Sequence, residues 1–438
     1  MAKLIVSGPQ EKWLECDIQP TKVSVGSVIK INDNKTDQRI FGFGGAFTDA
    51  ATITFNSLSK DKQEEYLKAY FSECGLAYTL GRYPIQSTDF STYTYSYLKD
   101  ADIKSFDMSE DQNRIEFVKR ALTYNPNLWL CAAPWSPCAF MKDNNDMCHG
   151  GKLLPKYYQL WADTLINTVK ELDKKGIRIR CLSTQNEPEA TQTWESCRYT
   201  AEEEANFLKN YLIPASNREK LPFLQFFIWD HNRDLMYERT NQIMNYGVPK
   251  ESLFGVAYHW YDRTAFEEVK KTHLAYPDLH ILLTECCVEL LCNDNNGLGS
   301  YENGLRYGVN IIKDLNNGSE GYIDWNLSLN LQGGPNHVGN YCEAPLMIDS
   351  NNNEIKYMPS YYIIGHFSRY LRPGDVRIDV DNSDYEILVT AFKSSTEIKV
   401  VTINTSSVKK EISILIDNHY CSFVLKPKHI STFVSNLL

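Results

Sequence analysis

The stretch IRIRCLSTQNEP, residues 177–188, has the composition of a buried β-strand that ends in an Asn–Glu pair. Pro188 has no backbone N–H to give to a sheet, so the strand ends before it. Asn186 and Glu187 therefore lie at the carboxyl end of the strand, the edge at which α/β barrels carry their chemistry. One carboxylate is weak evidence alone, so the rest of the sequence must supply a partner.

The same strand-then-helix pattern occurs eight times between residues 41 and 371. Near-continuous apolar runs alternate with segments of helical periodicity, and one such helix, beginning at Thr200, has Glu203 in capping-box spacing. Eight such units predict an α/β fold, a closed (β/α)8 TIM barrel over residues 41–371. An open doubly wound sheet is the alternative. The predicted strands are residues 41–48, 77–85, 128–135, 179–187, 225–231, 254–261, 280–286 and 321–329.

The two ends of the chain have a different pattern. Residues 372–438 contain short alternating segments with no helix between them, which is typical of antiparallel sheets. Residues 1–40 are also strand-like and have no helix of their own. We therefore expect an attached antiparallel β-sandwich domain built from both termini.

The overall composition limits the possible partners. The net charge is −10 with no basic block, which argues against nucleic acid as a partner. No apolar run approaches the roughly 20 residues of a spanning helix, so membrane insertion is not expected. The apolar stretch at the N-terminus is too short for a signal peptide, which predicts a cytoplasmic location. The oligomeric state cannot be predicted from the sequence.

The twelve cysteines are predicted to be free thiols in a reducing compartment. Many lie inside apolar strands, where cysteine behaves as a small hydrophobic residue, and a chain of 438 residues needs no disulfides for stability. Cys286, Cys287 and Cys292 are close in sequence but lack the paired C-x-x-C spacing and histidines of a zinc site. No metal and no cofactor are expected.

A second carboxylate stands at an equivalent position. Glu285 ends the seventh predicted strand as Glu187 ends the fourth. Opposite strands of an eight-stranded barrel direct both groups into one central pocket, and two such carboxylates indicate glycoside hydrolysis. A metal-dependent hydrolase is the alternative, although no His or Asp accompanies either Glu in ligand spacing.

Other strand ends carry residues that suit a sugar. A sugar ring has polar edges and apolar C–H faces, so a pocket of acidic, amide and aromatic side chains fits it. These strand-end residues are Arg82, Asp89, Trp135, His259, Tyr261 and Trp325.

Several longer motifs resemble glycoside hydrolase family 30, in its glucosylceramidase branch. They are FGFGGAFTDAA, QNEPE, HWY, DWNLSLN with the following GGPNHVGN, and GHFSRYL, and they extend through barrel and sandwich alike. The resemblance implies a retaining β-glycosidase on an eightfold barrel with an attached β-sandwich. The substrate would be a β-linked carbohydrate, most simply a β-glucoside.

The resemblance also implies roles for single residues. Glu187 matches the acid/base, and Glu285 matches the nucleophile, with Cys286 in place of the usual small residue after it. Arg82 matches the arginine that holds the nucleophile, which predicts an anionic Glu285 and a protonated Glu187. The sugar-contacting positions fall on Asp89, Trp135, Asn186, Trp325 and Asn340. Hydrogen bonds from Asp89 to the non-reducing end would give exo action.

The loop after the Asn–Glu–Pro motif departs from the lysosomal enzyme of this family. It is the compact EATQTWESCRYT, residues 189–200. Because this loop shapes the side of the pocket that holds the aglycone, lipid specificity does not carry over. A β-xylosidase, a β-fucosidase or a β-1,6-glucanase of the same family remains an alternative. A carbohydrate-binding protein without catalysis is disfavoured because both carboxylates are present.

Overall fold

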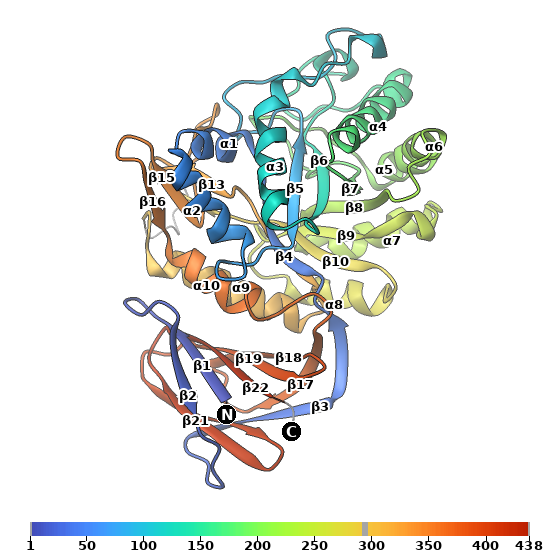
Figure 1. Ribbon diagram of the computed structural model, residues 1–438. Helices are drawn as coiled ribbons and strands as arrows, with labels where there is room; N and C mark the ends of the chain where they lie inside the picture. Colours follow the sequence, from blue (N-terminus) through green and yellow to red (C-terminus); the bar gives the residue numbers. More distant parts are fainter. Residues whose placement is uncertain (1, 291–296, 437–438) are drawn as a thin grey trace.

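A closed barrel of eight parallel strands forms the centre of the molecule (Figure 1). The computed structural model describes residues 2–290 and 297–436. The barrel confirms the predicted fold class and excludes the open sheet. Its strands are β4 (Gly42–Ala46), β5 (Leu80–Ile85), β6 (Trp129–Pro134), β7 (Ile179–Ser183), β8 (Gln225–Asn232), β9 (Leu253–His259), β10 (His280–Glu285) and β12 (Gly321–Asp324).

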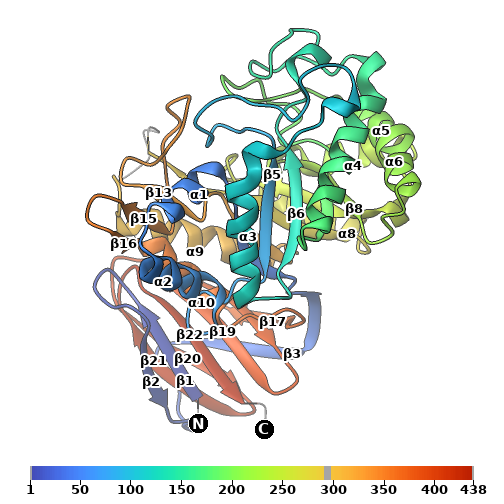
Figure 2. The same ribbon diagram turned by 45° about the horizontal axis from the view of Figure 1, so that its top comes forward.

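Helices surround the barrel, and Figure 2 shows α3 and α4 outside β5 and β6. Each packs an apolar face inward. The predicted capping box is present at α5, where the Thr200 side chain accepts from the Glu203 backbone and the Glu203 side chain accepts in return. The helices are α1 (Asp49–Asn56), α2 (Lys60–Phe71), α3 (Gln112–Tyr124), α4 (Tyr158–Lys174), α5 (Ala201–Phe207), α6 (Ile213–Arg218), α7 (Met236–Asn245), α8 (Phe266–Ala275), α9 (Tyr301–Asn316) and α10 (Pro359–Ser368).

The barrel interior changes character along its axis. Toward the amino-terminal ends of the strands it is filled by an apolar cluster that includes Leu80, Phe227 and Leu282. Glycines let the first strand lie close to its neighbour, because a Cβ on Gly44 would stand 2.1 Å from the Leu80 carbonyl oxygen. At the carboxyl-terminal ends the apolar filling gives way to buried charged groups, among them Arg82.

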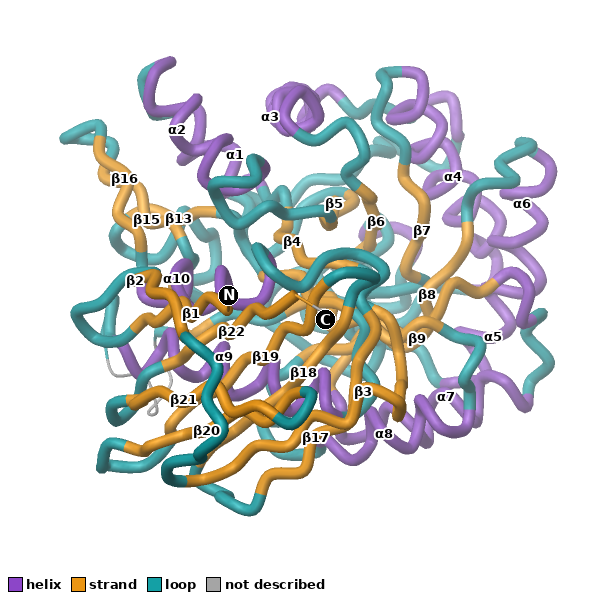
Figure 3. Tube along the Cα trace, turned by 60° about the horizontal axis from the view of Figure 1, so that its bottom comes forward, coloured by secondary structure: helices purple, strands orange, loops and turns teal. Residues whose placement is uncertain are grey.

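The second domain is one continuous sheet of nine strands that lies below the barrel in Figure 1 and toward the viewer in Figure 3. Its strands come from both ends of the chain, as expected, and β1 pairs with β22. All pairs but one are antiparallel, which confirms the predicted antiparallel domain, and the exception is β3, which runs parallel to β20. The sheet order is β2 (Leu14–Ile18), β1 (Ala2–Ser7), β22 (Ile430–Asn436), β19 (Glu397–Asn404), β18 (Ile387–Lys393), β17 (Val376–Asn382), β3 (Ser27–Arg39), β20 (Lys410–Ile416) and β21 (His419–Leu425).

The long strand β3 has different neighbours along its two edges. Its first residues, 27–30, pair with β20, and residues 29–39 pair with β17. The two edges of the sheet meet again at a bridge between Thr21 and Tyr420. The sheet thus folds back on itself and encloses its own apolar cluster, which includes Leu4, Val400 and Phe433.

Two helices, α9 and α10, lie between the barrel and the second domain (Figure 1). His366 of α10 lies between the hydroxyls of Ser7 and Thr432, each 2.8 Å from one ring nitrogen. Trp13 donates through Nε1 to the carbonyl of Tyr362 at 2.8 Å. These contacts fix the barrel to the sheet. Among the described residues, no helix is both long and apolar enough to cross a bilayer.

Short strands complete the rim of the barrel. Segment β13 (Ser328–Asn330) pairs with β15 (Leu346–Asp349), which pairs with β16 (Glu354–Tyr357). Segment β11 (Val288–Glu289) pairs with β14 (Cys342–Glu343). These pairs hold the long connection after β12 against the mouth of the barrel.

Candidate active site

The backbone is irregular where the barrel strands end. Five residues there have positive φ in the left-handed region, which non-glycine residues rarely adopt. In addition, β8 changes register with β9 beside Asp230, and β10 changes register with β9 just before Glu285. Such strained positions and bulges are concentrated at functional sites, where they redirect side chains. The five residues are Gln86, Glu187, Trp229, Asp230 and Asn326.

Arg82 is the centre of the charged layer. Its guanidinium donates to Glu285 Oε2 at 2.6 Å, to Asn186 Oδ1 at 2.8 Å and to Asp230 Oδ2 at 2.8 Å. The arginine and Asp230 are each 1% exposed. A buried guanidinium with three such acceptors has a fixed position. The structure thus places Arg82 beside Glu285, as the sequence predicted.

His259 joins the two glutamates. Its Nδ1 lies 3.0 Å from Glu187 Oε1 and 4.0 Å from Glu285 Oε1, and its Nε2 lies 3.2 Å from Asp230 Oδ1. One oxygen of Glu187 and one of Glu285 lie within 4.8 Å of each other. Tyr261 donates to Glu285 Oε1 at 3.0 Å. The carboxyls are therefore close together and held by different partners.

The position of His259 differs from one expectation. The sequence showed no histidine at ligand spacing from either glutamate, but the fold brings His259 next to both. Glu187, His259 and Glu285 together resemble a metal-ligand set. However, the Arg82 guanidinium already lies 2.6 Å from Glu285, and a divalent cation there would be repelled by it. These residues are therefore better suited to acid–base and nucleophilic chemistry by the two carboxyl groups than to metal binding.

Two tryptophans line the pocket. Trp135 follows β6 and Trp325 follows β12, and their rings stack with centroids 5.0 Å apart and planes 17° apart. The Arg82 guanidinium lies 4.9 Å from the Trp135 ring centroid, which adds a cation–π contact. Both rings are nearly fully buried, and together they give the pocket an apolar wall of the kind that packs on a sugar face.

Asp89 and Asn340 form the polar end of the pocket. Asn340 donates from Nδ2 to Asp89 Oδ2 at 2.8 Å, although the two residues are 251 positions apart. Burial raises the pKa of Asp89 well above its usual range, and Glu285 raises it further. The structure therefore brings together these two predicted substrate contacts.

The positive charge on His259 governs the ionisation of the site. Burial would lower the pKa of His259, but the negative charges of Glu285 and Asp230 raise it to about 9. Burial would likewise raise the pKa of Glu187, yet His231 and His259 lower it to about 2. Glu187 is thus ionised in the substrate-free site.

The nucleophile candidate shows the opposite direction. Burial raises the pKa of Glu285 and the charge of Glu187 adds to it, although His259 and Arg82 oppose both. These pKa directions are opposite to those expected for an anionic Glu285 beside a protonated Glu187, because two histidines face Glu187. Carboxyls this close titrate as a pair, so the proton belongs to the pair rather than to one residue.

Sequence reasoning missed several pocket residues. His231 and Asn232 end β8 and line the pocket, and Asp230 lies directly before them against Arg82. The polar residues after the apolar run QFFIW would have identified them by the rule applied to Glu187. Gln192 and Trp194, from the compact loop after β7, also line the pocket, and Gln192 lies 3.5 Å from Glu187. Loop residues carry no periodic signal, so only the tertiary structure reveals them.

The cysteines agree with the free-thiol interpretation within the described part of the chain, where no disulfide is formed. Cys287 lines the pocket and lies 3.3 Å from Cys342, sulfur to sulfur. Cys286 donates to the Tyr322 hydroxyl at 2.6 Å. Cys292 lies outside the described residues.

The model of the glycosyl hydrolase family 30 TIM-barrel domain matches residues 40–371. The chain belongs to glycoside hydrolase family 30. This family 30 enzyme is 34% identical over 378 residues to putative glucosylceramidase 4 of Caenorhabditis elegans, covering 82% of the chain and 73% of that protein. It is 28% identical to the lysosomal acid glucosylceramidase of Mus musculus, covering 89% and 79%.

A solved structure agrees with the family assignment. SrfJ from Salmonella typhimurium superimposes with a TM-score of 0.95 at 34% identity, and both chains are covered completely. The likeness therefore includes the nine-stranded sheet as well as the barrel. The protein is a glycoside hydrolase that acts on a carbohydrate substrate.

Proposed function

We propose that this family 30 enzyme is a retaining, exo-acting β-glycosidase that hydrolyses β-glucosides. One observation carries the proposal: an oxygen of Glu187 lies within 4.8 Å of an oxygen of Glu285. Retaining glycosidases hold their carboxyl groups about 5–5.5 Å apart, whereas inverting enzymes need about 6.5–9.5 Å to admit a water molecule. The short separation favours direct attack by one carboxylate.

The contacts of each glutamate support a different role for it. Glu285 is held from two sides, by Arg82 at 2.6 Å and by the Tyr261 hydroxyl at 3.0 Å, which suits a nucleophile that must attack from a fixed position. Glu187 is hydrogen-bonded to His259, whose pKa of about 9 keeps a proton next to it. Glu187 therefore has the partners of a group that gives and takes protons.

The reaction then proceeds in two displacements. Glu285 attacks the anomeric carbon while Glu187 donates its proton to the leaving oxygen, which gives a glycosyl-enzyme and the free aglycone. Glu187, now ionised, takes a proton from water, and the hydroxide displaces Glu285. In the free site the pair and His259 share the proton, and a bound sugar over Glu285 shifts it to Glu187.

The remaining contacts support exo action on a single sugar. Asp89 and Asn340 form a buried polar end to the pocket, where the hydroxyls of a terminal sugar would bind. The stacked Trp135 and Trp325 would pack on the ring, and Asn186, held by Arg82, would contact the 2-hydroxyl. β-Xylosides, β-fucosides and β-1,6-glucans are the competing substrates.

Azide rescue tests the two roles. A Glu285→Gly variant should lose turnover of every substrate, and azide in the vacated space should give an α-glycosyl azide from a β-glycoside. A Glu187→Ala variant should slow unactivated substrates by about 10²–10⁴-fold yet still react with a dinitrophenyl glycoside, and azide should then give the β-azide. Proton NMR assigns the anomers. If the azides were exchanged between the variants, the roles would be reversed.

A substrate panel tests the sugar and the exo action. It contains nitrophenyl β-glucoside, β-xyloside, β-fucoside and β-galactoside, together with glucosylceramide and a β-1,6-glucan. The proposal expects the aryl β-glucoside to be hydrolysed fastest and single glucose units to be released. Internal cleavage of the glucan with no action on aryl glucosides would contradict exo action, and binding without any hydrolysis would indicate a carbohydrate-binding protein.

A further inference from the structure

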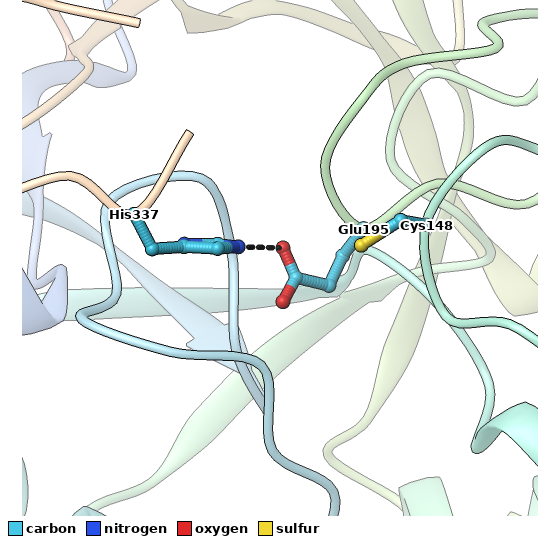
Figure 4. A group of neighbouring side chains, drawn as sticks. All are labelled: Cys148, Glu195 and His337. Atoms are coloured by element: carbon cyan, nitrogen blue, oxygen red, sulfur yellow. Dashed lines mark ion pairs between the residues drawn. The ribbon is translucent and has the colours of Figure 1, made fainter. Parts of the chain in front are cut away.

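A cysteine, a glutamate and a histidine from three different loops meet beside the active-site pocket (Figure 4). Cys148 follows β6, Glu195 follows β7, and His337 lies between β13 and β14. One ligand atom of each (Sγ, a carboxylate oxygen and a ring nitrogen) lies within 4.8 Å of the other two. None of the three lines the active-site pocket itself. This group, the rim cluster, has no role in the proposed reaction.

Glu195 is the unusual member of the rim cluster. Its side chain is 0% exposed, and neither carboxylate oxygen accepts a hydrogen bond from any described residue. The ion-pair partner of Glu195 is His337, whose Nε2 lies 3.5 Å from Glu195 Oε2 (Figure 4). A buried carboxylate without hydrogen bonds is energetically unfavourable unless a cation compensates its charge. The carboxylate is directed into the centre of the cluster.

The backbone holds the cluster in place. Cys148 and Glu195 face each other across an antiparallel bridge, and the flanking hydrogen bonds run from His149 N to Gln192 O at 2.8 Å and from Ser196 N to Met147 O at 3.0 Å. A sheet-like pair of this kind keeps two ligands at a constant separation. The backbone therefore holds the Cys148 thiol and the Glu195 carboxylate side by side before any ion binds.

His337 is oriented by its other ring nitrogen. Nδ1 lies 3.1 Å from the carbonyl oxygen of Ser91, and because a carbonyl only accepts, Nδ1 must carry the hydrogen. In the neutral ring Nε2 then presents its lone pair toward Glu195. A carbonyl that fixes the far nitrogen is the usual support of a metal-binding histidine.

We propose that the rim cluster binds a zinc ion through Cys148 Sγ, a carboxylate oxygen of Glu195 and His337 Nε2. A sulfur, a nitrogen and an oxygen donor suit zinc, whereas calcium and magnesium require oxygen donors throughout. The fourth position would take a solvent molecule on the side of Thr94, whose Oγ1 lies 3.9 Å from Sγ and 3.5 Å from Nε2. His337 is 13% exposed, which leaves a path for the ion.

The ion would tie together loops that shape the pocket. Trp194, which lines the pocket, is the neighbour of Glu195, and Asn340 is three residues after His337. Zinc at the rim cluster would thus fix the wall formed by the compact loop of residues 189–200. Its role is structural, because its ligands lie outside the pocket that holds Glu187 and Glu285.

The competing explanation is a simple ion pair. A protonated His337 would neutralise Glu195 at 3.5 Å, and Cys148 would then take no part in the interaction. The two explanations differ in the role of sulfur, since only the metal site binds through the thiolate. A spectroscopic probe of metal–sulfur bonding therefore separates them.

Cobalt substitution provides that probe. The full-length protein is stripped with a chelator, and Co²⁺ and then Zn²⁺ are titrated into it. The metal site predicts one cobalt ion per chain, a thiolate-to-cobalt charge-transfer band in the near ultraviolet, displacement of that band by Zn²⁺, and a Zn²⁺-dependent rise in Tm. Absence of the band in the wild-type protein would overturn the proposal without any variant.

Substitutions assign the band to the cluster. Cys148→Ser should remove it, and Glu195→Gln or His337→Asn should weaken Zn²⁺ binding by at least about 100-fold, more than the loss of a mere supporting contact. Matched controls are Cys16→Ser, at an exposed position of the second domain, and His419→Asn, at a half-buried one, and both should keep the band and the affinity. A band that survives Cys148→Ser in a folded protein would place the metal elsewhere and refute the assignment.

Discussion

Two buried histidines show how different the barrel mouth and the domain interface are. His259 lies among carboxylates at the mouth, where Glu285 and Asp230 overcome the effect of burial and raise its pKa to about 9. His366 lies between two hydroxyls at the interface, where burial, helped by Arg369, lowers its pKa to about 3. Both side chains are 0% exposed. The neighbours, and not the depth of burial, decide whether each carries a charge.

The difference reflects what each region does. The mouth concentrates Arg82, Asp230 and His259 with the two glutamates, although buried charges rarely improve stability over apolar packing. Such a cluster is maintained for chemistry. The interface contains neutral hydrogen bonds that join two domains. Four substitutions test this contrast.

The largest effect is expected from Arg82→Leu. Removal of the guanidinium leaves Glu285 and Asp230 buried without their partner, which should destabilise the fold by about 3–5 kcal/mol. Because Glu285 also loses its fixed position, kcat/KM should fall by about 10³-fold. Urea unfolding and aryl glucoside kinetics measure the two effects. The control is Arg178→Leu at a 52%-exposed surface pair, which should cost less than about 1 kcal/mol. Activity within tenfold of wild type would refute the central role of Arg82.

Asp89→Ala tests the polar end of the mouth. Loss of its hydrogen bonds to the sugar should cost about 2–4 kcal/mol of transition-state binding, because these hydrogen bonds form in a dry site and their sugar hydroxyls would be left without partners. Steady-state kinetics should show the loss mainly in kcat/KM. Asn340→Ala, which removes an uncharged substrate contact together with the partner of Asp89, should have a smaller effect. A larger effect of Asn340→Ala would show that Asp89 is not the main contact at this end of the pocket.

His259→Asn tests the charge at the mouth. A pKa raised from 6.5 to about 9 in the folded state contributes stability that is fully present below pH 6.5 and is lost as the pH rises through about 9. The wild type should therefore lose about 2–3 kcal/mol over this window, and the variant should not. Urea unfolding at a series of pH values measures it. Parallel curves for the two proteins would show that His259 is neutral in the fold.

His366→Gln is the mirror experiment at the interface, with the smallest expected effect. A folded-state pKa lowered to about 3 means that the unfolded chain binds a proton first, so stability falls as the pH drops below 6.5 and continues to fall toward about 3. By pH 5 the wild type should lose about 1–2 kcal/mol through this group. Gln still donates and accepts but cannot be protonated, so the variant should resist acid better. Its kcat/KM at neutral pH should match the wild type, and a large loss would link the interface to the site.

The sequence by itself determined the barrel and the identity of the main site residues. Apolar runs that end in polar residues identified the carboxyl ends of the strands. In a parallel barrel all these ends lie at the same mouth, so residues at them converge. Because Arg82, Glu187 and Glu285 each lie at such a strand end, the sequence predicts that they lie near one another. The resemblance added Asn340, which no strand pattern would have related to Asp89.

Only the tertiary structure decided how the charges are distributed and which loops meet. His231 and His259 face Glu187 and lower its pKa, an effect that depends on distances of a few ångströms and that the sequence did not predict. The parallel pairing of β3 with β20 joins segments from the two ends of the chain, and the meeting of Cys148, Glu195 and His337 depends on three loops. Local periodicity records which face of an element is buried. It does not record which residues from distant loops come into contact, because those contacts are fixed by the packing of the whole chain.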